Sequence, residues 1–257
     1  MADLLLAADR GRLRVLTLNR PDQLNAMNDA LYDAVAEALT AAETDPQVAT
    51  VVLTGAGRAF CVGQDLGEME QRPTYPPDER HGFAPFIEAL EGFAKPLVAA
   101  VNGLGVGIGL TLLPYCDRVV IDPAARLRAP FVALGVTAEA GSSVLLPRLI
   151  GPANAADILL TGRWIEAAEA VALGLAHELS APSEALAAAL RYAEPFQALP
   201  VASLVATKSL LVAGRKDAGR EARAREDAWF RILEGGPANR EAVAAFRERR
   251  PPDFSQF

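Results

Sequence analysis

Two glycine-rich segments of the chain could present backbone N–H groups as hydrogen-bond donors. The first, residues 103–109, has glycine at every second position and leads into an apolar run that is typical of a buried helix. Because the first N–H groups of a helix have no partner within it, such a terminus can bind an oxyanion. The alternative is that these glycines only allow the helix to pack closely.

The second segment, residues 54–66, runs from the end of a predicted strand through glycines into a tight turn at Gly63. The N–H group of Gln64 follows this turn, and it could therefore lie beside the N–H groups of the first segment. Two converging amides form an oxyanion hole, which stabilises negative charge developing on a carbonyl oxygen.

Nucleotide-binding motifs do not explain these glycines. A G-x-G-x-x-G motif beginning at Gly103 or Gly107 would need glycine at position 108 or 112, where the chain has Ile108 and Leu112. No glycine loop is followed by G-K-[ST], so a P-loop is excluded as well.

Side chains that commonly do chemistry are scarce elsewhere. The two histidines, His81 and His177, have no second histidine at ligand spacing, so no metal site is expected. Ser142 and Ser143 lack a nearby His–Asp arrangement, which argues against a serine hydrolase. For the other candidates we favour structural roles: turn capping for Asp65 and Asp117, solvent exposure for His81, core packing for Cys61 and Cys116, and core or interface packing for Trp164 and Trp229.

Composition indicates one large globular domain, or a domain with an appendage. The chain has 257 residues, 51% of them hydrophobic, with 25 Lys and Arg against 32 Asp and Glu. The net charge of −7 argues against a nucleic-acid-binding protein, which needs basic side chains along the phosphates. Two cysteines placed far apart predict no disulfide framework, so we expect a cytoplasmic protein.

One uncharged run, residues 96–116, is long enough to span a bilayer. Its alternating glycines, Asn102 near its middle, and Pro96 and Pro114 favour a buried strand, a turn and a buried helix instead. The N-terminus lacks a basic segment followed by a long apolar one, so no signal peptide is expected. We therefore expect no membrane partner.

The pattern of apolar residues predicts an α/β fold. Strands are expected at residues 13–18, 50–54, 97–101 and 118–121, and an amphipathic helix is expected after a cap at Asn28. Strands separated by helical segments favour parallel pairing. The proline-rich residues 68–86 predict a loop, which is either a solvated excursion or a flap beside a ligand site.

The character of the chain changes near Pro200, which separates a core, residues 1–199, from a C-terminal helical region, residues 200–257. Three helices are predicted in the second region, at residues 201–213, 217–234 and 237–249. The middle helix carries apolar residues that a small helical tail cannot easily bury alone. This indicates packing against a partner subunit.

Several motifs, taken in order, resemble those of the enoyl-CoA hydratase/isomerase (crotonase) superfamily. They are Leu18-Asn19-Arg20-Pro21 with Leu24-Asn25-Ala26, residues 54–66, Val101-Asn102-Gly103 with Cys116-Asp117, Leu160-Thr161-Gly162, Gly174-Leu175, and Phe246 ahead of Arg249-Arg250-Pro251. The match is collinear from near residue 4 to the end. The resemblance implies a spiral of ββα units with a C-terminal trimerisation region, and an acyl-CoA thioester as substrate with no separate cofactor.

The same resemblance places the oxyanion-hole amides on Gln64 and Ile108, and it implies a homotrimer or a dimer of trimers. Arg58, Arg249 and Arg250 either pair with the CoA phosphates or are simply solvated. We expect the substrate-binding residues to be Phe60, Val62, Gly63, Leu66, Gly107 and Phe131.

Side chains around the hole distinguish the reactions of this superfamily. Its hydratases use two glutamates, and the matching positions here hold Thr111 and Phe131, neither of which is a general base. A single carboxylate stands at Glu139, as in the 3-enoyl-CoA isomerases of the peroxisomal type. One base is enough to move a proton from the α-carbon to the γ-carbon of a 3-enoyl thioester, and it should lie in an apolar pocket. The structural alternative for Glu139 is an acidic residue in the first turn of a helix.

We therefore predict a 3-enoyl-CoA to trans-2-enoyl-CoA isomerase with Glu139 as its base. One alternative is an enoyl-CoA hydratase that uses Glu139 together with another group, such as a water held by Thr111. A second is a non-catalytic acyl-CoA-binding protein that keeps the oxyanion hole. A nucleic-acid role ranks last, because no basic stripe interleaved with aromatic residues is visible.

Overall fold

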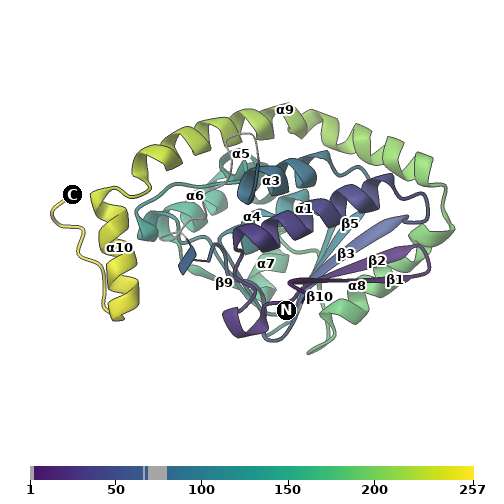
Figure 1. Ribbon diagram of the computed structural model, residues 1–257, viewed down its shortest axis with the longest axis horizontal. Helices are drawn as coiled ribbons and strands as arrows, with labels where there is room; N and C mark the ends of the chain where they lie inside the picture. The colour runs from purple at the N-terminus through teal and green to yellow at the C-terminus, as the bar shows by residue number, and fades with distance from the viewer. Residues whose placement is uncertain (1–2, 66, 69–79) are drawn as a thin grey trace.

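The computed structural model describes residues 3–65, 67–68 and 80–257, and its centre is a six-stranded sheet (Figure 1). The strand order is β1-β2-β3-β5-β7-β10. β1 and β2 pair antiparallel, and the other neighbours pair parallel, as predicted for an α/β fold. The strands are β1 (Leu5–Arg10), β2 (Leu13–Leu18), β3 (Thr50–Gly55), β5 (Leu97–Val101), β7 (Arg118–Ile121) and β10 (Glu178–Leu179).

A second sheet of four short strands lies beside the first, in the order β4-β6-β8-β9. β4, β6 and β8 run parallel, whereas β8 and β9 are antiparallel. These strands, of three residues each, are too short to show a period in the sequence, and none was predicted. They are β4 (Ala59–Cys61), β6 (Leu104–Val106), β8 (Arg126–Arg128) and β9 (Trp164–Glu166).

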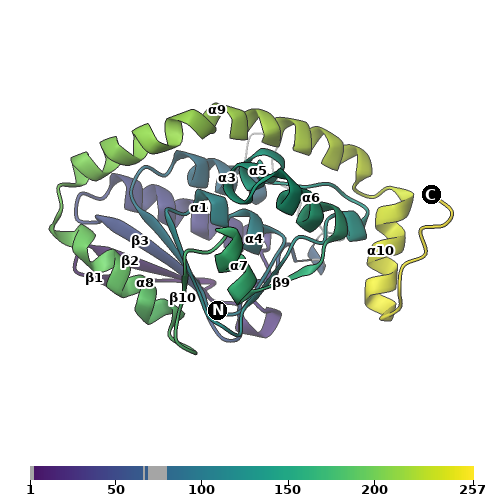
Figure 2. The ribbon, with the colours of Figure 1, turned by 180° about the vertical axis from the view of Figure 1, so that it is seen from behind.

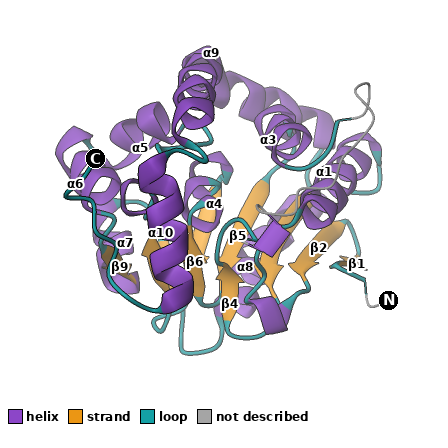
Figure 3. Ribbon diagram, turned by 60° about the vertical axis from the view of Figure 1, so that its left-hand side comes forward, coloured by secondary structure: helices purple, strands orange, loops and turns teal. Residues whose placement is uncertain are grey.

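Helices cover both faces of the large sheet (Figure 3). On one face, α1 (Asp29–Thr44) and α3 (Phe83–Gly92) pack against side chains such as Val51 and Leu53. On the other, α8 (Ala185–Ala193) packs its alanines against Val52 and Val98. The predicted cap of α1 is confirmed, because the Asn28 side chain accepts a hydrogen bond from Leu31 N at 3.1 Å.

The helix expected within residues 96–116 is shorter than predicted. It consists of one turn, α4 (Ile108–Thr111), followed by a 3-10 turn, η2 (Leu113–Tyr115). Pro114 has no backbone N–H and cannot continue an α-helix, which explains the early end. The remaining elements are η1 (Pro21–Gln23), η3 (Val132–Leu134), α5 (Ser142–Ile150), α6 (Pro152–Thr161), α7 (Ala167–Leu173) and η4 (Glu194–Ala198).

The C-terminal region has two long helices instead of the predicted three. α9 (Val201–Leu233) is continuous through Gly214 and extends over α3 and α5, and α10 (Pro237–Glu248) follows it (Figures 1 and 2). A glycine inside a helix costs only about 1 kcal/mol relative to alanine. Buried contacts on both sides of Gly214, at Lys208 and Glu226, offset that cost.

The prediction of a loop over residues 68–86 is wrong at both ends. Gly67 and Glu68 are helical, and α3 begins at Phe83. Pro85 stands in the first turn of α3, where a missing N–H breaks no helical hydrogen bond. Residues 69–79, which hold the other prolines, lie outside the described residues.

Among the described helices, none is by itself long and apolar enough to cross a bilayer. One pair of described helical segments meets the length and composition criteria only when the two are taken together. The first segment, Ala185–Ala198, comprises α8 and η4; the second is α9, and the two are bent by 117° relative to each other.

Candidate active site

Two parallel strands bring the predicted glycine segments together. β4 and β6 are neighbours in the small sheet, and each leads to a glycine with a left-handed backbone, Gly63 (φ 92°) and Gly107 (φ 56°). A Cβ atom on Gly107 would lie 3.6 Å from Gly63 Cα. The peptide groups that follow these two glycines are therefore adjacent, which is the arrangement expected for an oxyanion hole.

The two amides of this hole are available as donors. Met27 pairs with the residues on either side of Gln64, since Met27 N donates to Gly63 O at 2.8 Å and Asp65 N donates to Met27 O at 2.9 Å. The Gln64 N–H therefore points away from Met27. Ile108 begins α4, so its N–H has no partner within the helix. Within the described part of the chain, neither N–H donates a hydrogen bond.

The close approach of these strands requires glycine at two further positions. A Cβ atom on Gly109 would collide with Cys61 O, and one on Gly103 would collide with Arg58 O. The alternating glycines thus serve close packing as well as the presentation of amides. Oxyanion binding and close packing, the two interpretations of these glycines offered by the sequence, are therefore compatible, because the packing of β4 against α4 aligns the two donors.

Glu139 lies beside Gly107, the glycine that precedes Ile108. A Cβ atom on Gly107 would lie 3.9 Å from Glu139 Oε1 and 4.0 Å from Phe131 Cε1. Glu139 precedes α5 in a turn, and it does not belong to the first turn of that helix. The structure therefore brings together Gln64, Ile108 and Glu139, which are far apart in sequence.

The surroundings of Glu139 make it an unusually basic carboxyl group. Burial raises its pKa from 4.5 to about 8, and the nearby carboxylates of Glu226 and Asp227 add to this increase. The hydroxyl of Thr111 opposes it by stabilising the charged form. A group with a pKa near neutrality can both accept and return a proton.

The positions of the two hydratase glutamates carry no charge. Thr111 is fully buried on α4, and its hydroxyl donates to Gly107 O at 3.3 Å. Phe131 is also buried, with its ring edge facing Gly107. These two residues border the hole and supply a neutral wall around Glu139.

Of the other residues predicted to bind substrate, some lie at the candidate oxyanion hole and one does not. Val62 and Gly63 follow β4 at the hole, whereas the Phe60 side chain is fully enclosed in the main hydrophobic core. Leu66 lies outside the described residues.

The turn that carries Glu139 is held by two residues that the sequence did not single out. Tyr115 in η2 donates its hydroxyl to Ala140 O at 2.7 Å. Glu226 in α9 accepts from Gly141 N at 2.6 Å and from Ser143 N at 2.8 Å. Nothing in the densely charged stretch 217–234 separates Glu226 from its neighbours, because the contact joins residues 85 positions apart.

The remaining polar candidates have structural partners. Asp65 pairs with Arg20 at 2.9 Å, and Asp117 pairs with Lys208 at 2.7 Å. Burial raises the pKa of the Cys61 and Cys116 thiols to about 12 each, in keeping with core packing.

The histidine and arginine side chains singled out from the sequence are either paired with carboxylates or exposed. His81 faces Asp33 with a 2.7 Å contact and is only partly exposed, so the expectation of a solvent-facing histidine is wrong. Arg250 is engaged by Glu241 and Glu248, whereas Arg58 is exposed. Across residues 3–65, 67–68 and 80–257, no group of His, Cys, Asp and Glu could hold a metal ion.

Comparison with known proteins shows the family to which this chain is similar. The family described as enoyl-CoA hydratase/isomerase matches residues 10–257. A protein of Thermus thermophilus named putative enoyl-CoA hydratase is 39% identical, over 97% of this chain and all of that protein. An Escherichia coli protein named 1,2-epoxyphenylacetyl-CoA isomerase is 31% identical, over 99% of both chains.

A solved structure shows the same fold. The crystal structure of an enoyl-CoA hydratase/isomerase from Pseudoalteromonas atlantica superposes with a TM-score of 0.93 at 35% identity, covering 98% of this chain and all of that one. The fold is thus that of the crotonase class. The chain belongs to the enoyl-CoA hydratase/isomerase family.

Proposed function

We propose that this protein isomerises 3-enoyl-CoA thioesters to trans-2-enoyl-CoA thioesters, with Glu139 as the single base. The observation that carries the proposal is one carboxyl group with a pKa near 8 beside two free backbone amides. Thr111 and Phe131, which border the same hole, offer no second base.

The reaction follows from these groups. The thioester oxygen accepts hydrogen bonds from Gln64 N and Ile108 N. Glu139 takes a proton from the α-carbon, and the resulting enolate charge is stabilised by about 3 kcal/mol for each donor. Glu139 then returns the proton to the γ-carbon, which leaves the double bond between the α- and β-carbons.

Replacement of the base tests the assignment. We expect Glu139→Ala to lower turnover of a 3-enoyl-CoA by ~10²- to 10⁴-fold, the usual contribution of a general base. Glu37→Ala, at an exposed position on α1, is the matched control and should keep full activity. Undiminished turnover by the Glu139 variant would exclude it as the base.

Hydration is the second candidate, because the Thermus thermophilus relative is named a hydratase and the Thr111 hydroxyl acts on Glu139. Rates of hydration and isomerisation, measured on substrates of the same chain length, separate these two reactions. A non-catalytic acyl-CoA-binding protein is the third candidate, and exchange of the α-proton in deuterated water would exclude it.

The proposal includes self-association through the C-terminal region, as a trimer or a dimer of trimers. Large apolar side chains are exposed there: Trp229 is 61%, Ile232 67% and Phe246 64% exposed. Exposure of this kind supports contact with another subunit.

A further inference from the structure

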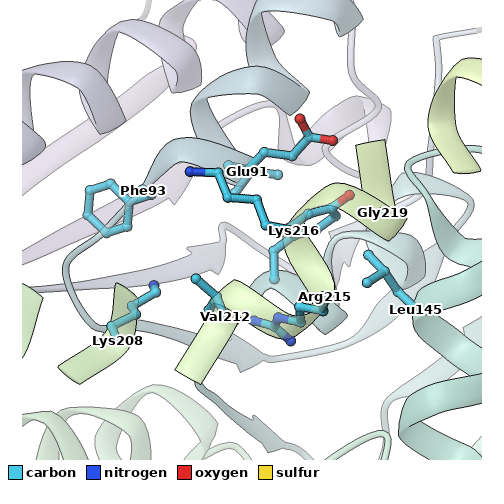
Figure 4. A pocket seen from close by; sticks show the side chains of 10 residues that line it. Glu91, Phe93, Leu145, Lys208, Val212, Arg215, Lys216 and Gly219 are labelled. Carbon is cyan, nitrogen blue, oxygen red and sulfur yellow. The ribbon is translucent and has the colours of Figure 1, made fainter. Parts of the chain in front are cut away.

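Two partly buried ion pairs join helix α9 to the core. Lys208 contacts Asp117 at 2.7 Å, and Arg223 contacts the buried Glu91 of α3 at 3.1 Å. Side chains of α9 and α3 line a cavity of about 40 Å³ beside these pairs. Figure 4 shows Glu91 and Gly219 among the residues that line it. This cavity is too small for a substrate.

One helical turn after Arg223, α9 contacts the tight backbone turn that carries Glu139. Glu226 is only 5% exposed, and its two carboxylate oxygens accept from Gly141 N and Ser143 N at 2.6 and 2.8 Å. The first N–H groups of α5 lack helical partners, so a carboxylate at this point stabilises them and the positive end of the helix.

The turn itself needs such support. Ala140 has φ 59° and Gly141 has φ 70°, both in the left-handed region. A left-handed backbone is unfavourable for a residue with a Cβ atom such as Ala140, and it persists only where contacts hold it. Tyr115 holds Ala140 O from one side, and Glu226 holds the amides that follow it.

We propose that Glu226 is a positioning residue for the reaction: from α9 it holds the Glu139 turn in its left-handed form and keeps the base beside the oxyanion hole. This inference rests on the proposed function in one respect, since it takes Glu139 as the base. Glu226 itself does not touch the reacting atoms, because both its oxygens are used by backbone amides.

Glu226 also acts on the base through its charge. The groups near Glu139 come from four elements: Glu226 and Asp227 on α9, Thr111 on α4, Tyr32 on α1 and Cys61 on β4. Burial is the main cause of the raised pKa of Glu139, and Glu226 is the largest charge contribution to it. Removal of this charge should therefore lower the pKa of Glu139.

Glu226→Gln tests both effects in the full chain. Glutamine keeps the shape but offers one oxygen to two amide donors, and it carries no charge. We expect kcat to fall by about 10- to 100-fold, as for a base displaced by a fraction of an ångström to 1 Å, with KM within about twofold of its original value. The midpoint of the pH–rate profile should move to lower pH, because the negative charge that raises the pKa of Glu139 is removed.

Glu221→Gln is the matched control on the same helix. Its side chain is 73% exposed and forms an ion pair with Arg225 at 3.9 Å. This variant should leave kcat and the pH midpoint unchanged. A folded Glu226→Gln protein that behaves like the control, or one that loses kcat without any shift of the midpoint, would overturn the inference.

A second variant, Glu226→Asp, tests the inference if the Glu226→Gln protein does not fold. Glu226→Asp keeps the charge but is one methylene shorter, so it cannot reach both amides. We expect a lower kcat with a pH midpoint close to that of the original protein. An unchanged kcat in this variant would also overturn the inference.

A direct measurement separates this inference from the proposed function. The carboxyl resonances of ¹³C-labelled glutamate report the pKa of Glu139 without any substrate. If Glu139→Ala keeps its turnover, the proposed function fails, while a pKa shift in Glu226→Gln still supports the contact. If Glu139→Ala is inactive and Glu226→Gln leaves the pKa unchanged, the function stands and the inference fails.

Discussion

The two sides of the site are built differently. On the donor side, Gln64 and Ile108 present backbone amides that are fixed by β4, β6 and the glycines between them. On the base side, Glu139 stands in a left-handed turn held by side chains of η2 and α9. The donor side is therefore sensitive to any added atom, whereas the base side is sensitive to the loss of a single hydrogen bond or charge.

After the loss of the base itself in Glu139→Ala, the largest effect is expected on the donor side. In Gly109→Ala, the new Cβ atom would collide with Cys61 O, and β4 would have to move away from α4. The two amides would then separate, and loss of one donor costs about 10²- to 10³-fold in kcat. Steady-state kinetics with a 3-enoyl-CoA, together with circular dichroism to check the fold, measures this effect.

Gly92→Ala is the control for that experiment. A Cβ atom on Gly92, the last residue of α3, would have no neighbour within 4 Å. It should retain both the fold and the activity. Full activity of Gly109→Ala would contradict the close packing described for the donor side.

The second prediction concerns the charge of the base. Proton removal needs Glu139 ionised, so kcat/KM should rise with pH through a midpoint near 8. At pH 6 only about 1% of a group with this pKa is ionised, which predicts a rate ~100-fold below the plateau. A profile measured between pH 5.5 and 9.5 tests this, and a flat profile below pH 8 would show that an ordinary carboxylate is in place.

The smallest effect is expected at Thr111, where the two sides meet. Its hydroxyl has one proton and two acceptors within reach: Gly107 O at 3.3 Å, and the carboxylate of Glu139, whose pKa is lowered when the hydroxyl donates to it. Thr111→Val should therefore raise that pKa and move the rate profile to higher pH. The same variant sharpens the choice of reaction: if it abolishes hydration but keeps exchange of the α-proton, Thr111 holds a water molecule.

Much of the donor side could be predicted from the sequence. Apolar runs with glycine at their ends mark β3 and β5 to within a residue, and the segments around Gly63 and Gly107 carry their backbone requirement in the residue type itself. A glycine required for a left-handed turn is a local signal. Glu139 was singled out as the proposed base only through the family resemblance, since nothing in its neighbours alone indicates a base.

The support of the base side could not be predicted. Glu226 acts on residues 85 positions earlier, and only the packing of α9 on α5 brings them together. The continuity of α9 depends on the same packing, because Gly214 weakens the helical pattern in the sequence. Three-residue strands such as β4 and β6 are likewise set by tertiary pairing and not by local periodicity.

The raised pKa of Glu139 links its proposed role as the base to the stability of the fold, and the two depend on pH in opposite directions. The ordinary pKa of 4.5 applies to the unfolded chain, and about 8 applies to the folded one, so the folded state binds this proton more tightly. The resulting contribution to folding is complete below pH 4.5 and is lost as the pH rises through 8. Enolate formation needs the proton to be absent. The conditions that ionise the base are therefore those in which this carboxyl group favours the folded state least.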